Sequence, residues 1–367
     1  MKYCTWKDLL EVAFLKRGIV ISKDFLRDNN GIYPVYSSQT VNDGIMGYIN
    51  TFMFDGEFLT WTTDGANAGT IFHRKGKFNI TNVCGLIEIK DDTIIKYRFL
   101  YFWLSYVSKQ YVLEGMGNPK LMSNRMGLIK IPLPHIKVQE GIVKILDSFT
   151  NLIDALNEEL SLRQKQFEYY REKLLTFDDK SINVNITPLG EIGNVCMCKR
   201  IMRNETNNEG GIPFYKIGTF GGIADSFISK DKFEEYKNKY NYPKLGDILI
   251  SASGTIGKTV VFDGKPSYYQ DSNIVWIDND ETKVINSFLR YIYTVIDWKV
   301  DDGGVIKRLY NTNIRSTLIT YPKEKAVQQS IVEKLDAFES LISSLKEEIA
   351  LRQKQYEYYR EKLLTFD

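Results

Sequence analysis

The chain has 367 residues, of which 43% are hydrophobic and 26% charged, and its 48 basic and 46 acidic side chains leave a formal net charge of +2. These values exclude a disordered chain, a collagen and a disulfide-stapled miniprotein, and the length suits two domains. No apolar run approaches the roughly 20 residues of a membrane span, and the first residues lack the apolar core of a signal peptide. The four cysteines follow no framework spacing, which indicates reduced thiols in a cytoplasmic protein.

Residues 1–137 are predicted to form an α+β domain. Short β-type runs alternate with Gly, Asn and Asp turns between residues 31 and 89, and residues 94–112 are a helix candidate. The loops carry amide, hydroxyl and cationic groups, which suit base edges and phosphates. These candidate DNA contacts are Ser37, Ser38, Gln39, Thr62, Thr63, Asn67, Arg74, Lys75, Lys77, Lys120, Asn124 and Arg125. Each alone could equally be a solvated loop residue, so the prediction depends on their clustering.

Residues 138–178 are predicted to form a long helix that recurs at 326–367. Segments 146–178 and 335–367 are identical at 24 of 33 positions, and neither contains Pro or Gly. Apolar steps of three and four residues predict a heptad seam, along which we expect the two copies to pair antiparallel as a coiled-coil spacer with approximate two-fold symmetry. The seam residues are Phe149, Ile153, Leu156, Leu160, Arg163, Phe167 and Tyr170 in the first copy and Phe338, Ile342, Leu345, Ile349, Arg352, Tyr356 and Tyr359 in the second.

An arginine occupies the same seam position in both copies, as Arg163 and Arg352. Two interpretations are open. The side chain either extends out of the seam into water, or it makes a polar contact that fixes the register or meets a partner.

Residues 179–325 are predicted to repeat the fold of residues 1–137 with a different surface. Gly69 matches Gly257, and Leu121 matches Leu309, at an offset of 188 residues. The candidate DNA contacts here are Lys199, Arg200, Ser251, Ser253, Thr255, Lys258, Lys307, Arg308, Asn311 and Asn313. Divergent surfaces on one fold predict two different ligands of the same type.

Several segments match catalytic motifs only in part. Residues 252–259 fit a relaxed phosphate-loop pattern, but a strand is predicted to follow them where a phosphate site needs a helix. Asp64, Glu88 and Lys90 imitate a nuclease set that the second half lacks. The chain has two histidines and no aminomethyltransferase motif. We therefore expect no catalytic site, no metal and no cofactor in this chain.

The arrangement resembles the specificity subunit of type I restriction–modification systems. The resemblance rests on the duplicated helix and on the segments YPVYSSQTVNDGIMGYI (33–49), WTTDGANAGTIF (61–72), LIKIPLPHIKVQEGIVKILD (128–147) and GDILISASGTIGKT (246–259). It implies two target-recognition domains, 1–137 and 179–325, that each read one half of a bipartite, asymmetric DNA site. The conserved helices, 138–178 and 326–367, would set the spacer and dock the partner subunits.

The resemblance also implies the partners and the cell type. Two modification subunits would bind S-adenosylmethionine and methylate DNA, and two restriction subunits would use ATP and Mg²⁺, all in a bacterial or archaeal cytoplasm. The alternatives from other classes are a coiled-coil adaptor whose two domains bind proteins or glycans, and a stand-alone nuclease or methyltransferase.

The small net charge hides an uneven distribution. Residues 1–137 carry a net charge of +5 and residues 179–325 carry +2, whereas the helical segments 138–178 and 326–367 carry −3 and −2. This pattern favours domains that meet phosphates and helices that meet protein.

Overall fold

The computed structural model describes residues 4–115, 117–177, 182–300 and 308–366, and the chain divides into two compact units. The first unit comprises residues 1–157 and 348–367, and the second comprises residues 158–347. Each unit therefore holds one globular domain together with a segment of both long helices. These helices are α5 (Ile136–Thr176) and α9 (Lys325–Leu363), which confirms the two predicted helices with ends shifted by a few residues.

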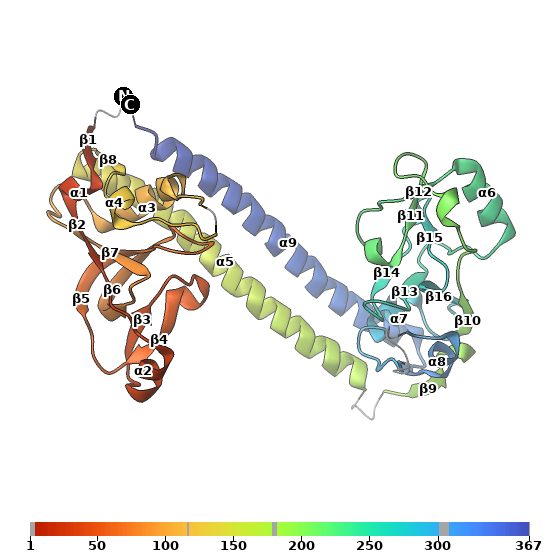
Figure 1. The fold of residues 1–367 in the computed structure, drawn as a ribbon. Helices are drawn as coiled ribbons and strands as arrows, with labels where there is room; N and C mark the ends of the chain where they lie inside the picture. The colour runs from red at the N-terminus through yellow and green to blue at the C-terminus, as the bar shows by residue number, and fades with distance from the viewer. Residues whose placement is uncertain (1–3, 116, 178–181, 301–307, 367) are drawn as a thin grey trace. The chain divides into compact units, whose positions relative to one another are not determined.

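The first unit contains a six-stranded sheet with the order β2-β7-β5-β6-β3-β4 (Figure 1). Neighbouring strands are antiparallel except β3 and β6, which are parallel. A separate antiparallel pair of strands, β1 and β8, precedes α5. The strands are β1 (Thr5–Asp8), β2 (Ala13–Arg17), β3 (Tyr33–Tyr36), β4 (Ile45–Ile49), β5 (Phe54–Thr62), β6 (Ile71–Ile80), β7 (Cys84–Ile89) and β8 (Lys130–Leu133).

Helix α3 (Tyr97–Val107) packs on β5 and β6 and contributes Phe99 and Leu100 to the core. Trp61 on β5 is fully buried, and its Nε1 donates to the carbonyl oxygen of Leu121 at 2.9 Å. The core also includes Leu146 of α5 and Leu364 beyond the end of α9, so both helices help to hold this domain. Its short helices are α1 (Leu9–Val12), α2 (Lys23–Asp28) and α4 (Ser123–Met126).

The second unit contains a four-stranded sheet, β10-β16-β13-β14, a three-stranded sheet, β12-β11-β15, and the pair β17-β9. Its strands are β9 (Val184–Pro188), β10 (Gly193–Cys196), β11 (Ile212–Tyr215), β12 (Phe227–Ile228), β13 (Ile248–Ser251), β14 (Thr259–Val261), β15 (Tyr268–Tyr269), β16 (Ile274–Asn279) and β17 (Leu318–Pro322). Its helices are α6 (Lys230–Lys239), α7 (Asn286–Ile292) and α8 (Asn311–Ser316).

The two domains share one strand topology. The order β2-β7-β5-β6 corresponds to β10-β16-β13-β14, and the pair β1–β8 corresponds to β9–β17. Each unit also has a parallel pair of strands. In the first unit β3 pairs with β6, with Val35 opposite Asn79, and in the second β11 pairs with β15, with Phe214 opposite Tyr268. The prediction of two α+β domains with the same fold is confirmed.

Within each unit, the segments of α5 and α9 lie side by side and run antiparallel (Figure 1). In the first unit the ring of Phe149 stacks on Tyr359 with centroids 5.4 Å apart, and in the second the ring of Phe338 stacks on Tyr170 at 5.5 Å. Phe149 and Phe338 are equivalent repeat positions, as are Tyr170 and Tyr359. The same contact is therefore made once in each unit, between equivalent positions of the repeat.

A buried glutamine joins each domain to its helix. In the first unit Gln139 Nε2 donates to the carbonyl oxygens of Ile94 and Pro134 at 2.8 and 2.9 Å, and its Oε1 accepts from Lys96 N at 3.0 Å. The equivalent Gln328 makes the corresponding three bonds in the second unit. Both glutamines are 0% exposed. The junction between domain and helix is thus fixed by specific polar contacts.

Within the described ranges, no helix is long and apolar enough to cross a membrane.

Candidate nucleic-acid interface

Three loops of the first unit are bonded together, and we call them the first loop cluster: residues 37–44 after β3, residues 63–70 between β5 and β6, and residues 112–115 and 117–122 before α4. Asn67 Nδ2 donates to Thr40 Oγ1 at 3.0 Å, and Leu121 N donates to Thr63 O at 2.9 Å. The cluster joins polar loops from distant parts of the chain into one surface.

The second unit has an equivalent set of loops, which we call the second loop cluster. It consists of residues 216–223 after β11, residues 252–258 between β13 and β14, and residues 308–310 before α8. Leu309 N donates to Ala252 O at 2.9 Å, in the same way that Leu121 meets Thr63. Lys258 Nζ donates to Phe220 O at 2.5 Å and so links the first two loops. The same three loop positions therefore meet in both domains.

The two matched glycines lie in these clusters, and the backbone conformation explains why glycine occurs at both positions. Gly69 has φ +82° and Gly257 has φ +80°, a region that disfavours side chains. A Cβ atom would approach Val112 Cγ2 to 3.1 Å at Gly69 and Trp298 Nε1 to 2.6 Å at Gly257. Both positions need glycine for the loop to fold.

Most of the predicted DNA contacts on these loops are accessible. They lie on the clusters or on the short helices α4 and α8, and their side chains are exposed or half-buried. This set comprises Ser37, Ser38, Gln39, Asn67, Lys120, Asn124, Arg125, Thr255, Lys258, Arg308, Asn311 and Asn313. Lys120 Nζ lies 3.8 Å from the Asp64 carboxylate. Asn67 and Thr255 lie at exposed turn positions.

Five predicted contacts are buried, and the structure does not support a DNA-contacting role for them. Thr62, Thr63, Arg74, Ser251 and Ser253 are between 0% and 7% exposed. Thr62 Oγ1 accepts from Thr70 N at 3.0 Å, and Ser251 Oγ accepts from Lys258 N at 2.9 Å. Because these polar atoms are used inside the turns, they shape the loops instead of presenting groups to a base.

Four further candidates lie away from the clusters in sequence and topology. Lys75 and Lys77 are on β6 opposite Glu57 and Asp55, toward the end of the β5–β6 hairpin remote from its turn, and their amines lie 3.4 and 4.0 Å from those carboxylates.

In the second unit Arg200 Nε donates to Asp271 at 2.8 Å, and Lys199 Nζ lies 5.3 Å from the centroid of the Tyr240 ring. Lys307 is outside the described residues.

The approximated catalytic motifs do not assemble. Residues 252–259 form the turn between the antiparallel strands β13 and β14, so no helix N-terminus follows that could face a phosphate. Glu88 pairs with Lys16 at 2.5 Å, and Lys90 Nζ donates to Leu10 O at 2.6 Å. Asp64 instead accepts from the Thr63 hydroxyl at 2.6 Å. Each of these three residues has its own partner.

Sequence reasoning missed the residues that support the loop after β3. Arg74 contacts Asp43, and its guanidinium lies 3.7 Å from the Tyr36 ring centroid and 4.3 Å from that of Phe72. Asn42 and Asp43 have φ values of +51° and +50°, and such a conformation costs on the order of 1–3 kcal/mol per residue. The only sequence sign was the Asn-Asp-Gly turn signature.

The helix pair offers a second kind of surface. Leu162 and Tyr169 are 59% and 58% exposed, and the equivalent Leu351 and Tyr358 are 56% and 52% exposed. Large apolar side chains are therefore exposed at the same repeat positions of both helices, where neither seam nor domain covers them.

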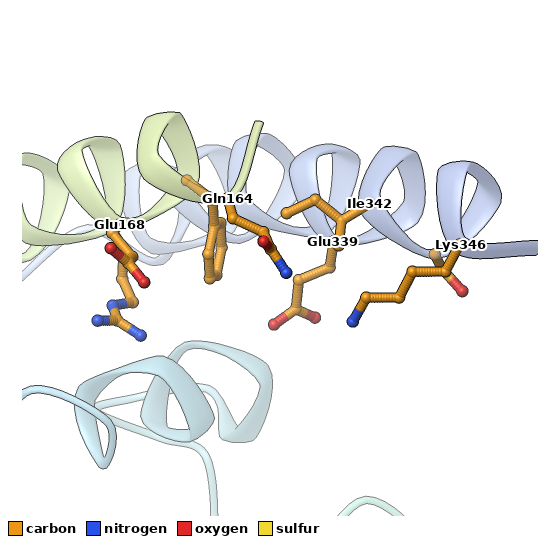
Figure 2. Close-up of a pocket in the computed structure, with 8 residues that line it drawn as sticks. Gln164, Glu168, Glu339, Ile342 and Lys346 are labelled. Carbon is orange, nitrogen blue, oxygen red and sulfur yellow. The ribbon is translucent and has the colours of Figure 1, made fainter. Parts of the chain in front are cut away.

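A pocket of about 500 Å³ lies on the helix pair of the second unit. Figure 2 shows Gln164 and Glu168 extending from α5, and Glu339, Ile342 and Lys346 extending from α9. At the equivalent positions of the first unit, Thr150 replaces Glu339 and Asn157 replaces Lys346. The pair of opposite charges that Glu339 and Lys346 bring to this pocket is thus specific to the second unit.

The seam arginines bond to their own helices. Arg163 donates to Gln166 at 3.0 Å and lies 3.4 Å from Glu159, and Arg352 repeats this with Gln355 and Glu348 at 2.8 and 2.7 Å.

Two domains of one fold, each with a polar loop cluster and each held on both helices, define a duplicated recognition subunit. The family model described as the type I restriction modification DNA specificity domain matches residues 1–162 and again residues 182–351. The chain therefore belongs to the DNA specificity subunits of type I restriction–modification systems.

Individual relatives agree with this assignment. A type I restriction enzyme specificity subunit of Haemophilus influenzae is 45% identical over 377 residues, which cover 98% of this chain and 95% of the relative. A type I specificity subunit of Mycoplasma pneumoniae is 30% identical over 100% of this chain and 98% of its own length. The crystal structure of the S subunit from M. genitalium shares the fold, with a TM-score of 0.66 at 15% identity, over 100% of this chain and 97% of that one. The adaptor alternative finds no support among these proteins.

Proposed function

We propose that this specificity subunit reads a bipartite, asymmetric DNA site through its two loop clusters, one half-site for each domain. The two clusters support this because they share a scaffold and differ in accessible side chains. Lys120 corresponds to Arg308, and Asn67 corresponds to Thr255. Direct readout depends on such groups, so one scaffold with two sets of groups suits two different half-sites.

The helix pair would set the unspecified gap between the half-sites. Helix α5 has 41 residues and α9 has 39, which corresponds to a length of about 60 Å. Adding seven residues after Leu160 and after the equivalent Ile349 lengthens each helix by about 10 Å. We expect the gap to grow by about three base pairs while both half-sites stay the same. An unchanged gap would contradict the spacer role.

Two modification subunits would dock on the duplicated helix surface that contains Leu162 and Tyr169 in one unit and Leu351 and Tyr358 in the other. Two copies of one partner need two copies of one docking surface, and exposed apolar groups commonly mark protein contacts. Methylation with S-adenosylmethionine would then be a property of these partners. ATP use and Mg²⁺-dependent cleavage would belong to two restriction subunits in the same cytoplasmic complex. This chain would itself be non-catalytic.

The decisive experiment is methylation mapping of DNA from cells that carry this chain with its modification subunit. The expected result is one bipartite motif with two different half-sites. Replacing residues 1–137 with another recognition domain should change one half-site only. If the replacement alters both half-sites, the domains do not read independently and the proposal fails.

A further inference from the structure

An arginine is buried beneath the exposed tip of the first loop cluster. Arg74 is 3% exposed, although Lys75 and Lys77 on the same strand, β6, are exposed. Its guanidinium is stacked between the rings of Tyr36 and Phe72. Nη2 donates to the carbonyl oxygen of Asp43 at 2.7 Å, and Nη1 bonds to the Asp43 carboxylate. One side chain thus holds both the backbone and the side chain of the loop.

The loop held in this way has an unusual backbone. Asn42, Asp43 and Gly44 are three consecutive residues with φ values of +51°, +50° and +77°. The base of the loop is closed by the bond from Ser37 N to Gly44 O at 3.1 Å. Val41, at the tip, is 75% exposed, and Asn42 and Asp43 are exposed beside it. A strained and exposed tip is therefore kept in one conformation by the arginine buried beneath it.

The exposed groups at the tip are those that read base edges. An asparagine amide can make two bonds to adenine, a carboxylate accepts from the amino group of cytosine, and apolar groups contact the thymine methyl. One oxygen of the Asp43 carboxylate bonds to Arg74, and the Asp43 side chain is still 65% exposed, so it can accept a hydrogen bond from a base edge. The tip differs in this respect from the lysine positions, which suit phosphates.

We propose that residues 41–43 are the specificity-determining tip of the first recognition domain and that Arg74 is the positioning residue that presents them. This inference rests on the proposed reading of one half-site by each domain. It assigns to Arg74 a role in the fidelity of base recognition without contact with DNA. A rigid tip discriminates better than a mobile one, because less ordering remains to be done on binding.

The test uses the full chain with its modification subunit and maps methylated sites in three test variants and one control variant. Asn42→Gly and Asp43→Gly remove the readout groups, and glycine tolerates the positive φ of both positions. We expect discrimination at one or two positions of the first half-site to fall roughly 5- to 150-fold, with the second half-site and the gap unchanged. Asn30→Gly, an exposed loop position of the same domain, is the matched control and should leave the motif intact.

Arg74→Lys tests the positioning role, because lysine keeps the charge and loses the planar fork and the stacking. It should relax the same base positions as the two glycine variants, while affinity for non-specific DNA stays within about twofold of the wild type. If Arg74→Lys fails to fold, the two glycine variants still decide. A wild-type first half-site in both glycine variants, or a change in the second half-site, overturns the inference. Absence of any bipartite motif for the wild-type complex would instead overturn the proposed function.

Discussion

Replacement of Gln328 by alanine should destabilise the second unit strongly, although the residue contacts neither a seam nor a loop cluster. Gln328 is 0% exposed. Its Oε1 accepts from Ile285 N at 2.9 Å, and its Nε2 donates to Lys283 O and Pro322 O at 3.0 and 2.7 Å. Alanine cannot make these three hydrogen bonds, so the backbone N–H of Ile285 and the carbonyl oxygens of Lys283 and Pro322 lose their glutamine partner. At 0.5–1.5 kcal/mol for each bond, the loss of unfolding free energy is about 3 kcal/mol.

Urea titration measures the loss of unfolding free energy, and thermal unfolding measures the corresponding drop in Tm. For a unit of this size, 3 kcal/mol corresponds to a Tm lower by about 6–12 °C. The neighbouring Gln329 is exposed and bonds only to Glu333 at 3.2 Å, so Gln329→Ala is the matched control and should cost less than about 1 kcal/mol. If Gln328→Ala lowers stability no more than Gln329→Ala does, then the buried glutamine does not fix the junction between domain and helix, and the reasoning is refuted.

Two further predictions concern charged groups. Arg163 bonds to Glu159 and Gln166 of its own helix, so Arg163→Leu should change the unfolding free energy by no more than about 1 kcal/mol; loss of co-purification with the modification subunit would favour a partner contact instead. Asp247 is 3% exposed, and burial raises its pKa although its carboxylate accepts from Lys244 N at 2.7 Å. Because the folded state binds this proton more tightly than the unfolded chain does, its contribution to stability is present at low pH and is lost as pH rises through the raised pKa. Asp247→Asn should therefore stabilise the second unit at pH 7 by more than it does near pH 4 in urea unfolding, and an equal gain at both would contradict this explanation.

The helices were predictable because their information is local. The heptad steps, the absence of Pro and Gly, and the duplication all lie within one continuous segment. Antiparallel pairing followed because each helix carries an apolar stripe that needs a partner. The matched Leu121 and Leu309 likewise predicted one fold for both domains, and both are buried in equivalent positions.

The accessible surface was less predictable because burial depends on neighbours far away in sequence. Thr62 ends strand β5, and Thr63 follows it directly. Because β5 lies between β7 and β6, even polar side chains there are covered. Arg74 occurs in a basic run that is typical of an exposed strand, yet Tyr36 from a different strand covers it. No periodicity in residues 71–80 records that contact.

The internal duplication separates two constraints on the surface of this chain. A helix pair by itself requires only its buried positions to match, yet Leu162 matches Leu351 and Tyr169 matches Tyr358 at positions more than half exposed. An exposed leucine kept in both copies is costly to solubility, which is consistent with a common partner that covers it. The loop clusters show the opposite pattern. Gly69 and Gly257 keep the same backbone, whereas the exposed groups around them differ. A constant helix surface and variable loop surfaces on a constant scaffold are what a subunit needs if it holds two copies of one enzyme while reading two different half-sites.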